Sequence, residues 1–412
     1  MRVLVITNVP PRADGNTMGV QQTFYRLRKL IHAHEFIVAY TNPEQLPEPQ
    51  TCAAVPFQLV RLPNPARAKP ASPPRSHIER QLRAWQHTLF ATAPQIYHEL
   101  HDRTLNHAIS ELVSARVPDI VHVIGEPMLM NTPSFHAPLL ADFPDLFSIL
   151  FARTNRAALR KRTHQWQHAR EMDKIRRIER SIMTRATAAL FVSETDRAAA
   201  QKIFPAARTF VVPNAVDLDF FQSAETQQEN IILFTGTLSY APNIQALQFF
   251  QREIFPRLMA AVPHAQLHIV GYNPPPEILA MQNEQVQVFA NVPDVRPYLA
   301  RAAVCIAPIL SGSGTRIKII EAWAMHQAVV STRIGAEGLD AQHGTHLLLH
   351  DDAPAFADAV IALLRNPAQR RALGENGYRL AAEKYSMTRA AHDLNAVYQF
   401  IYEHAPDKAR AA

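Results

Sequence analysis

The chain has 412 residues, a length that exceeds one ordinary hydrophobic core and predicts two domains. Its two cysteines, Cys52 and Cys305, are far apart in sequence, which excludes a disulfide framework or a cysteine-rich metal site and fits a reducing compartment. The net charge of +6 suits an anionic small ligand, an acidic membrane surface or nucleic acid, and does not choose among them.

The segment MRVLVITNVPP (1–11) is predicted to be a first strand, because its apolar run is too short for a signal-peptide core or a membrane span. No other apolar run approaches spanning length. We therefore expect a cytoplasmic protein, and a peripheral contact with the inner face of a membrane stays open.

Short apolar runs alternate with stretches of helical periodicity, which predicts right-handed βαβ units. Near-continuous runs are typical of strands covered on both faces, as in parallel sheets. The first half contains such runs at 3–7, 36–40, 57–60, 120–124, 146–151 and 188–193. The second half contains them at 210–212, 231–235, 267–270, 286–289, 303–309, 328–332 and 346–349. The predicted fold is α/β, with two Rossmann-like, doubly wound parallel-sheet domains facing a cleft.

Two segments near the middle of the chain have distinct signatures. A helix is predicted over 194–203, with Ser193 as its N-cap and Asp196 as an acid in its first turn. The segment VPNAVDLDFFQ (212–222) is predicted to be an ordered linker between the halves, because Pro213 and Asn214 interrupt any helix.

From Arg153 to Arg185, eleven lysines or arginines stand against three acids, Glu171, Asp173 and Glu179. If this segment is helical, it presents a basic face. A solvated helix is one interpretation, and contact with a phosphate-bearing acceptor or an anionic lipid surface is the other.

The loop after the first strand is not a Gly-x-Gly-x-x-Gly motif, which disfavours a nicotinamide or flavin site. Gly15 and Gly19 still permit close backbone approach, and Gly19 is predicted to open a helix whose N-terminus would attract an anion. An ordinary β-to-α turn is equally compatible. The proline-rich region 61–74 is predicted to be a loop, either a connection or an acceptor-side element.

The stretch SGSGTRIKIIEAWA (311–324) carries the clearest chemical signal. A small-residue loop follows a predicted strand and opens a helix over about 315–325, whose first-turn amides are available donors. Arg316 and Lys318 add positive charge suited to a diphosphate, and Glu321 can accept two hydroxyl hydrogen bonds, as a ribose diol requires. Gly236 and Gly271 each follow a strand and permit a tight turn or the approach of a ligand.

Five segments of the chain have the character of family motifs: VSETDRAAAQKI (192–203), VVPNAVDLDFF (211–221), IKIIEAWA (317–324), STRIGAEGL (331–339) and ENGYRLAAEKYSM (375–387). They resemble glycosyltransferase family 4, also called glycosyl transferases group 1, whose members are retaining, metal-independent GT-B enzymes. The resemblance is specific from Val192 to Met387 and looser in the first half, around Gly19 and HEFIVAYT (34–41).

The resemblance implies an N-terminal acceptor-side domain over 1–205, completed by the C-terminal helix 388–412, and a nucleotide-sugar-binding domain over 206–387. It implies that Glu321 holds the ribose, that the base lies near 290–293 and that Gly19 approaches the diphosphate. The expected donor-binding residues are Gly19, Gly236, Thr237, Gly271, Asn291, Val292, Ser313, Gly314, Thr315, Arg316, Lys318 and Glu321. No cofactor, no metal and no nucleic-acid partner are expected, and the acceptor is a glycan, a lipid-linked sugar or a small molecule.

The sequence departs from the family pattern at several positions. Ser313 stands where the family has a sugar-contacting Glu, and Thr237 with 242–243 replaces the usual Arg and Lys. We hypothesise that the cations have moved to the later loop. His326 replaces a glycine after the helix, and histidine tolerates positive φ better than most residues.

The family's first-domain histidine matches Ile124, and His122 is expected to point elsewhere on its strand. Glu126 is the nearest polar substitute, with a plain loop carboxylate as the alternative. The candidate catalytic residues are therefore Glu126, Arg316 and Lys318. Same-face substitution is expected, with the departing diphosphate accepting the proton of the acceptor hydroxyl.

Two other functions remain open. A degenerate GT-B protein would bind nucleotide or a partner without transfer, as Ser313 and the absent histidine allow. A sugar-nucleotide epimerase of similar architecture has less support, because the C-terminal motifs follow the transferase pattern.

Overall fold

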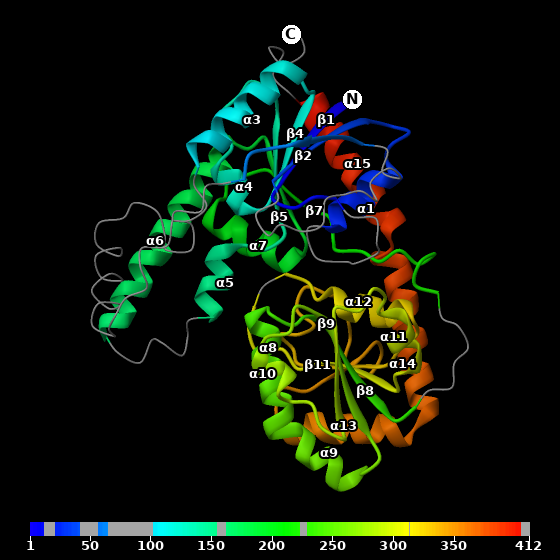
Figure 1. Cartoon of the computed structure of the whole chain (residues 1–412). Coiled ribbons are helices and arrows are strands. Elements are labelled where there is room, and N and C mark those ends of the chain that lie inside the picture. The colour runs from blue at the N-terminus through cyan, green and yellow to red at the C-terminus, as the bar shows by residue number, and fades with distance from the viewer. Residues whose placement is uncertain are drawn as a thin grey trace. The chain divides into compact units, whose positions relative to one another are not determined.

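The computed structural model describes residues 1–11, 21–41, 57–64, 102–154, 162–222, 229–312 and 314–404. The chain forms two compact units, each built around one parallel sheet with helices packed about it (Figure 1). The first unit comprises Met1–Ala13, Leu27–Val212 and Asp393–Ala412, and the second comprises Asp14–Arg26 and Pro213–His392. The predicted α/β class with two parallel sheets is confirmed.

The first unit has a seven-stranded sheet in the order β3-β2-β1-β4-β5-β6-β7. Its strands are β1 (Arg2–Thr7), β2 (Glu35–Tyr40), β3 (Gln58–Arg61), β4 (Ile120–Ile124), β5 (Leu139–Phe143), β6 (Ala188–Phe191) and β7 (Thr209–Val211). Its helices are α3 (Arg103–Arg116), α4 (Glu126–Met130), α5 (Phe147–Thr154), α6 (Arg162–Arg185) and α7 (Glu194–Ile203). Two further helices, α1 (Gln21–Lys29) and α15 (Met387–Glu403), are shared between the two units.

The second unit has a six-stranded sheet in the order β10-β9-β8-β11-β12-β13. Its strands are β8 (Ile231–Thr237), β9 (Gln266–Tyr272), β10 (Val286–Ala290), β11 (Val304–Ala307), β12 (Val329–Ser331) and β13 (Leu348–Leu349). Its helices are α8 (Ala241–Phe249), the π-helical η4 (Phe250–Ile254), α9 (Phe255–Ala261), α10 (Pro276–Leu279), α11 (Arg296–Arg301), α12 (Ile317–Ala324), α13 (Ala353–Arg365) and α14 (Pro367–Lys384).

The predicted N-cap of 194–203 is confirmed, and α7 has the predicted bounds. The Asp196 amide donates to Ser193 Oγ at 3.1 Å, and Ser193 Oγ donates to Asp196 Oδ2 at 2.6 Å. This exchange satisfies an amide that has no acceptor within the helix.

Two strand predictions are wrong. The apolar run 146–151 is helical from Phe147 onward and belongs to α5, whereas the strand of that region is β5, which pairs with β4 and β6. The run 210–212 was placed with the second half, but β7 is the edge strand of the first sheet, paired with β6.

A buried polar network explains why the apolar pattern of β5 is interrupted. Asp142 interrupts its apolar run, yet Asp142 Oδ2 lies 3.2 Å from His122 Nε2 on the neighbouring strand β4. His122 Nδ1 lies 2.7 Å from the Tyr398 hydroxyl of α15, and all three side chains are buried. The tertiary partners therefore offset the cost of burying the polar groups.

Two buried carboxyl groups hold the beginning of α5. The Phe147 amide donates to Glu126 Oε1 at 2.9 Å, and the Ser148 amide donates to Glu179 Oε1 at 2.8 Å. Carboxylates are favourable at a helix N-terminus, but burial raises the pKa of both groups. The pKa of Glu126 rises well above its ordinary value of 4.5, first through burial and then through the neighbouring charge of Glu179.

Because this pKa rises on folding, the folded chain binds the proton more tightly than the unfolded chain. The free energy of unfolding must therefore fall as the pH rises from about 4.5 through the folded pKa. Glu126→Gln keeps an acceptor for the Phe147 amide and cannot ionise. We compare the free energy of unfolding of this variant with that of the parent at each pH. We expect the difference, variant minus parent, to be larger at about pH 8.5 than at about pH 5 by roughly 1 kcal/mol or more.

Urea unfolding at the two pH values measures this difference, with the exposed Glu383→Gln as the matched control. A difference between Glu126→Gln and the parent that stays constant with pH would contradict the raised pKa.

Candidate functional site

The second sheet reverses its strand order between β8 and β11. From β8 the chain builds outward through β9 and β10, and from β11 it builds in the other direction through β12 and β13. In doubly wound sheets, ligands bind beyond the carboxyl ends of the strands at such a reversal. The loops that follow β8 and β11 are therefore the parts of this unit best placed for a ligand.

Two glycines bring the ends of β8 and β9 together. Gly236 and Gly271 are register partners, and a Cβ atom on Gly271 would lie 1.8 Å from the Gly236 carbonyl oxygen. Gly236 has φ of +142°, a conformation that L side chains rarely adopt. The glycines predicted here are thus required by the backbone.

The ends of β9 and β10 are joined through two asparagines in the left-handed region. Asn273 has φ of 52° and Asn291 has φ of 54°. The Asn291 amide donates to the Gly271 carbonyl at 2.7 Å, while Asn291 Oδ1 accepts from the Asn273 amide at 2.8 Å. Val292, the next residue, is half-buried against the core, so the predicted base-side segment lies directly beside the glycine pair.

The loop after β11 is folded by two glycines and an arginine. Gly312 and Gly314 have φ of 117° and 70°. Arg316 Nη1 donates to the Gly314 carbonyl at 3.0 Å, and a Cβ atom on Gly312 would lie 2.7 Å from Arg316 Nη2. The guanidinium group thus lies across its own loop, and its fixed set of five donors is suited to planar anions.

Lys318 reaches from α12 to β8. Its Nζ donates to Asn243 Oδ1 at 3.0 Å and lies 3.6 Å from the centroid of the Phe234 ring. A Cβ atom on Gly236 would lie 3.2 Å from the same Nζ. The ammonium group therefore lies at the end of β8, next to the residue that replaces a family cation.

The pKa of Lys318 is held well below its usual range. Burial of the ammonium group contributes most, although the residue as a whole is half-buried; the Arg316 charge lowers it further and Glu321 opposes both. A polyanionic ligand would reverse this balance, because a nearby negative charge favours the charged ammonium form.

Glu321 lies one turn after Lys318 on α12 and is 6% exposed. Residues three apart share a helix face, which agrees with the electrostatic effect of Glu321 on Lys318. A plain solvated Glu was the alternative, and the burial of this side chain argues against it.

The hydroxyl of Thr315 belongs to a network that the sequence did not predict. Asn214 Nδ2 donates to Thr315 Oγ1 at 2.9 Å. Arg26 donates to the carbonyl of Pro213 at 2.9 Å, and the Ala215 amide donates to Gln22 Oε1 at 2.8 Å. The linker is therefore held by side chains one turn apart on α1.

The sequence did not predict two further polar residues of the site, Asn243 and Gln245. Asn243 also donates from Nδ2 to the Thr237 carbonyl at 2.8 Å, and Ser311 Oγ donates to Gln245 Oε1 at 2.9 Å. Asn243 and Asn214 stand in segments quoted for the resemblance or its departures, which was the available signal. Gln245 had none.

The turn after α12 behaves as the sequence indicated. His326 has φ of 56°, its ring stacks on Tyr378 with centroids 4.0 Å apart, and its Nδ1 lies 3.1 Å from Glu375 Oε2. A Cβ atom on Gly374 would lie 2.0 Å from the His326 carbonyl oxygen. The prediction that histidine can adopt this positive φ is confirmed.

Three candidates are not among the described residues of this cluster in the second unit. Glu126 follows β4 in the first unit, where it is buried and bonded to α5 as described above. Its catalytic role stays a prediction. Gly19 and Ser313 lie outside the described residues.

The described part of the chain offers neither a metal-binding cluster nor a membrane-spanning helix. It contains no group of three or more His, Cys, Asp or Glu side chains that could hold a metal ion. Among its helices, none has both the length and the apolar character needed to cross a membrane.

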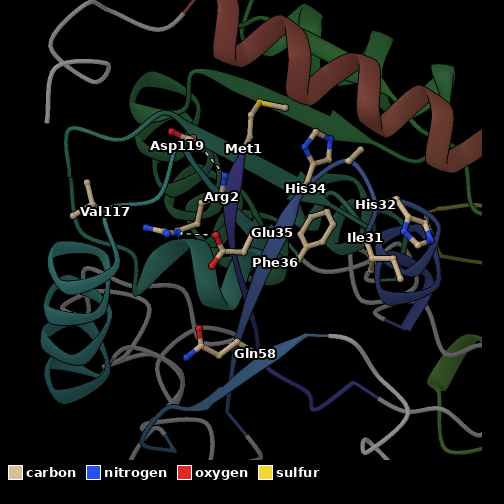
Figure 2. Close-up of a pocket in the computed structure, with 11 residues that line it drawn as sticks. Met1, Arg2, Ile31, His32, His34, Glu35, Phe36, Gln58, Val117 and Asp119 are labelled. Atoms are coloured by element: carbon tan, nitrogen blue, oxygen red, sulfur yellow. Dashed lines mark hydrogen bonds and ion pairs between the residues drawn. The ribbon is translucent and has the colours of Figure 1, made fainter.

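A hollow of about 800 Å³ opens at the amino ends of β1 and β2 in the first unit (Figure 2). Arg2 binds both acids of this hollow: its Nε donates to Glu35 Oε2 at 3.1 Å, and its backbone amide donates to Asp119 Oδ2 at 2.7 Å. Because ligands of doubly wound sheets bind at the opposite strand ends, we assign no donor role to this hollow.

Known proteins resemble this chain in sequence and in fold. Residues 229–366 match the family model Glycosyl transferases group 1. The phosphatidyl-myo-inositol mannosyltransferase of Mycobacterium leprae is 26% identical over 202 residues, which cover 46% of this chain and 53% of that protein. The chain spans about half the length of the curated relatives that it matches.

Solved structures match over nearly the whole chain. Sucrose-phosphate synthase from Thermosynechococcus elongatus has a TM-score of 0.69 at 18% identity, covering 98% of this chain and 100% of that one. Anabaena HepE in complex with UDP-glucose has a TM-score of 0.65 at 10% identity, covering 97% and 100%. Residues 229–366 therefore resemble glycosyl transferases group 1 in sequence, and the two parallel sheets and the solved structures give the chain the GT-B fold.

Proposed function

We propose that the protein transfers a sugar from a nucleotide-diphospho-sugar donor to an acceptor hydroxyl. The observation that carries this proposal is the convergence of Arg316, Lys318 and buried Glu321 on a glycine loop at the strand reversal of the second sheet. The family match of this region and the UDP-glucose bound by HepE support the same donor class.

In this proposal, the donor diphosphate lies at the first turn of α12. The amides of Ile317 and Lys318 occupy a turn in which helical amides lack an intrahelical acceptor, and two cations flank them. Glu321 accepts hydrogen bonds from the ribose hydroxyls, and the base lies along 291–292, beside the Gly236–Gly271 pair.

The position of Lys318 supports the hypothesis that the cations have moved. Thr237 and Asn243 stand where the family has Arg and Lys, and the Lys318 ammonium group is hydrogen-bonded to Asn243. A cation from the later loop thus reaches the position beside β8.

The reaction follows from the chemistry of the leaving group. The bond between the anomeric carbon and the diphosphate oxygen breaks, and the acceptor oxygen bonds to the same carbon on the same face of the sugar. The departing diphosphate takes the proton of the acceptor hydroxyl, so no protein base is required. Arg316 and Lys318 stabilise the charge that develops on the diphosphate, because their positive charges face the leaving group.

We further propose that the acceptor is a glycan, a lipid-linked sugar or a small molecule in the synthesis of a cell-surface polysaccharide or glycoconjugate. The lipid-inositol acceptor in the name of the M. leprae relative supports this range. The transfer is proposed to need neither metal nor cofactor and to occur in the cytoplasm. The second candidate is a degenerate GT-B protein that binds nucleotide without transfer, and Ser313 in place of the sugar-contacting Glu favours it.

We expect one donor from a panel of UDP-, GDP- and ADP-sugars to raise the melting temperature of the protein and to release nucleoside diphosphate. Thermal shift and mass spectrometry measure the two effects. Binding without release under any acceptor would favour the degenerate binder, and the absence of both would refute the transferase.

Replacing Glu321 with Gln should lower the affinity for the donor nucleotide by about tenfold or more, because hydrogen bonds from the ribose to a charged acceptor are lost. Binding of inorganic diphosphate should change little. Calorimetric titration compares the variant with Glu284→Gln, an exposed control in the same unit. Unchanged nucleotide affinity would remove the ribose assignment.

The double change of Arg316 and Lys318 to Ala should weaken the binding of nucleoside diphosphate and of free nucleoside to different extents. The loss of affinity for the diphosphate should be at least about tenfold larger, because only the diphosphate contacts these cations. The control removes the same charge at exposed Arg252 and Arg257. Equal losses for the two ligands would argue against a diphosphate role.

A further inference from the structure

Helix α6 of the first unit presents a basic face to solvent. Figure 1 shows it as a long helix, and it packs against α4, α5 and β5. Trp166, Arg170, Asp173, Arg177 and Arg180 are exposed and follow each other at intervals of three or four residues, which places them on one side of the helix. Arg176 is exposed beside this stripe.

The opposite face of α6 anchors the helix to the first unit. Met172, Ile175 and Ile182 are buried there, and Lys174 Nζ donates to Glu171 Oε1 at 2.7 Å within the buried face. Two of the three acids of the basic segment are therefore buried: Glu171 with its lysine, and Glu179 at the start of α5. Folding thus leaves Asp173 as the one exposed acid in the described part of this helix.

The exposed face carries four arginines, Arg170, Arg176, Arg177 and Arg180, against one acid. That acid, Asp173, is hydrogen-bonded to Arg177 at 2.5 Å. Within the described part of the chain Arg180 forms no ion pair, and the charge of Arg176 acts on the buried Glu179, where it opposes the rise that burial causes in the pKa of that carboxyl. Over about 20 Å of helix, a net positive surface faces outward.

A large aromatic ring lies at one end of this basic stripe. Trp166 is 43% exposed, and the Arg170 guanidinium carbon lies 5.6 Å from the centroid of its ring. An indole has an apolar body and one polar donor, a combination that favours the boundary between lipid headgroups and acyl chains.

We propose that the exposed face of α6, formed by Trp166, Arg170, Arg176, Arg177 and Arg180, docks on an anionic lipid surface. The arginines lie against the headgroup phosphates, and Trp166 enters the interface. Charge complementarity favours this partner, because the face of α6 is basic and the lipid surface is acidic. Trp166 favours a lipid surface over a dissolved polyanion, which offers no apolar layer for the ring.

This surface lies in a different unit from the donor site, and its test needs no donor. The full-length protein is sedimented with phosphatidylcholine vesicles that contain either no or about 30% phosphatidylglycerol. We expect binding only to the anionic vesicles, and we expect it to weaken as the salt concentration rises.

Changing Arg170, Arg176, Arg177 and Arg180 to Gln should weaken vesicle binding at least about 100-fold, because each arginine near an anionic surface contributes roughly fivefold. The matched control changes four exposed arginines of the second unit to Gln: Arg252, Arg257, Arg371 and Arg379. Its affinity should stay within about threefold of the parent. Equal losses in the two variants would overturn the proposal, because net charge alone would then explain binding.

Two single changes test the assignment if the quadruple variant does not fold. Asp173→Asn removes the acid from the face and should strengthen binding by up to about fivefold. Trp166→Phe should abolish most of the blue shift of tryptophan fluorescence on vesicle binding. Unchanged binding in Asp173→Asn, an intact blue shift in Trp166→Phe, or binding to soluble polyphosphate that matches binding to vesicles would each overturn the proposal.

Discussion

Parallel pairing is the constraint on which the candidate site depends. Because every strand of the second sheet runs in the same direction, the loops after β8, β9, β10 and β11 all leave from one edge. The reversal of strand order then lies between β8 and β11, and in doubly wound sheets the loops on either side of such a reversal border the place where ligands bind. The contact between Gly236 and Gly271 shows how closely the backbones approach at this edge.

The electrostatics of the site follow from this crowding. Arg316 and Lys318 lie near enough to lower the pKa of the lysine, and burial lowers it more strongly. Such an arrangement costs free energy in the ligand-free protein, where two cations share a confined space with one carboxylate. A bound diphosphate would offset that cost, so the arrangement favours a dianionic ligand over a neutral one.

In the first unit, the buried polar groups are hydrogen-bonded to one another or to backbone amides. His122, Asp142 and Tyr398 satisfy one another in the core, and the paired carboxyls of Glu126 and Glu179 hold the amides that begin α5. On α6 itself, Glu171 and Glu179 are buried, and the exposed face is basic. The same tertiary packing thus places structural acids inside and cations outside.

Hydrophobic periodicity and the residues that end helices and strands determined the α/β class and most of the strands. They also determined the N-cap at Ser193, the loop-to-helix unit around Arg316 and Glu321, and the positive φ tolerated at His326. These features depend on local backbone preferences, which act over a few residues. The strand at 139–143, the helix at 147–154 and the pairing of β7 were decided by tertiary structure, because buried partners such as His122 and Glu126 come from distant segments. The same holds for Asn214, Asn243 and Gln245 in the site, because their partners Thr315, Lys318 and Ser311 come from a distant part of the chain.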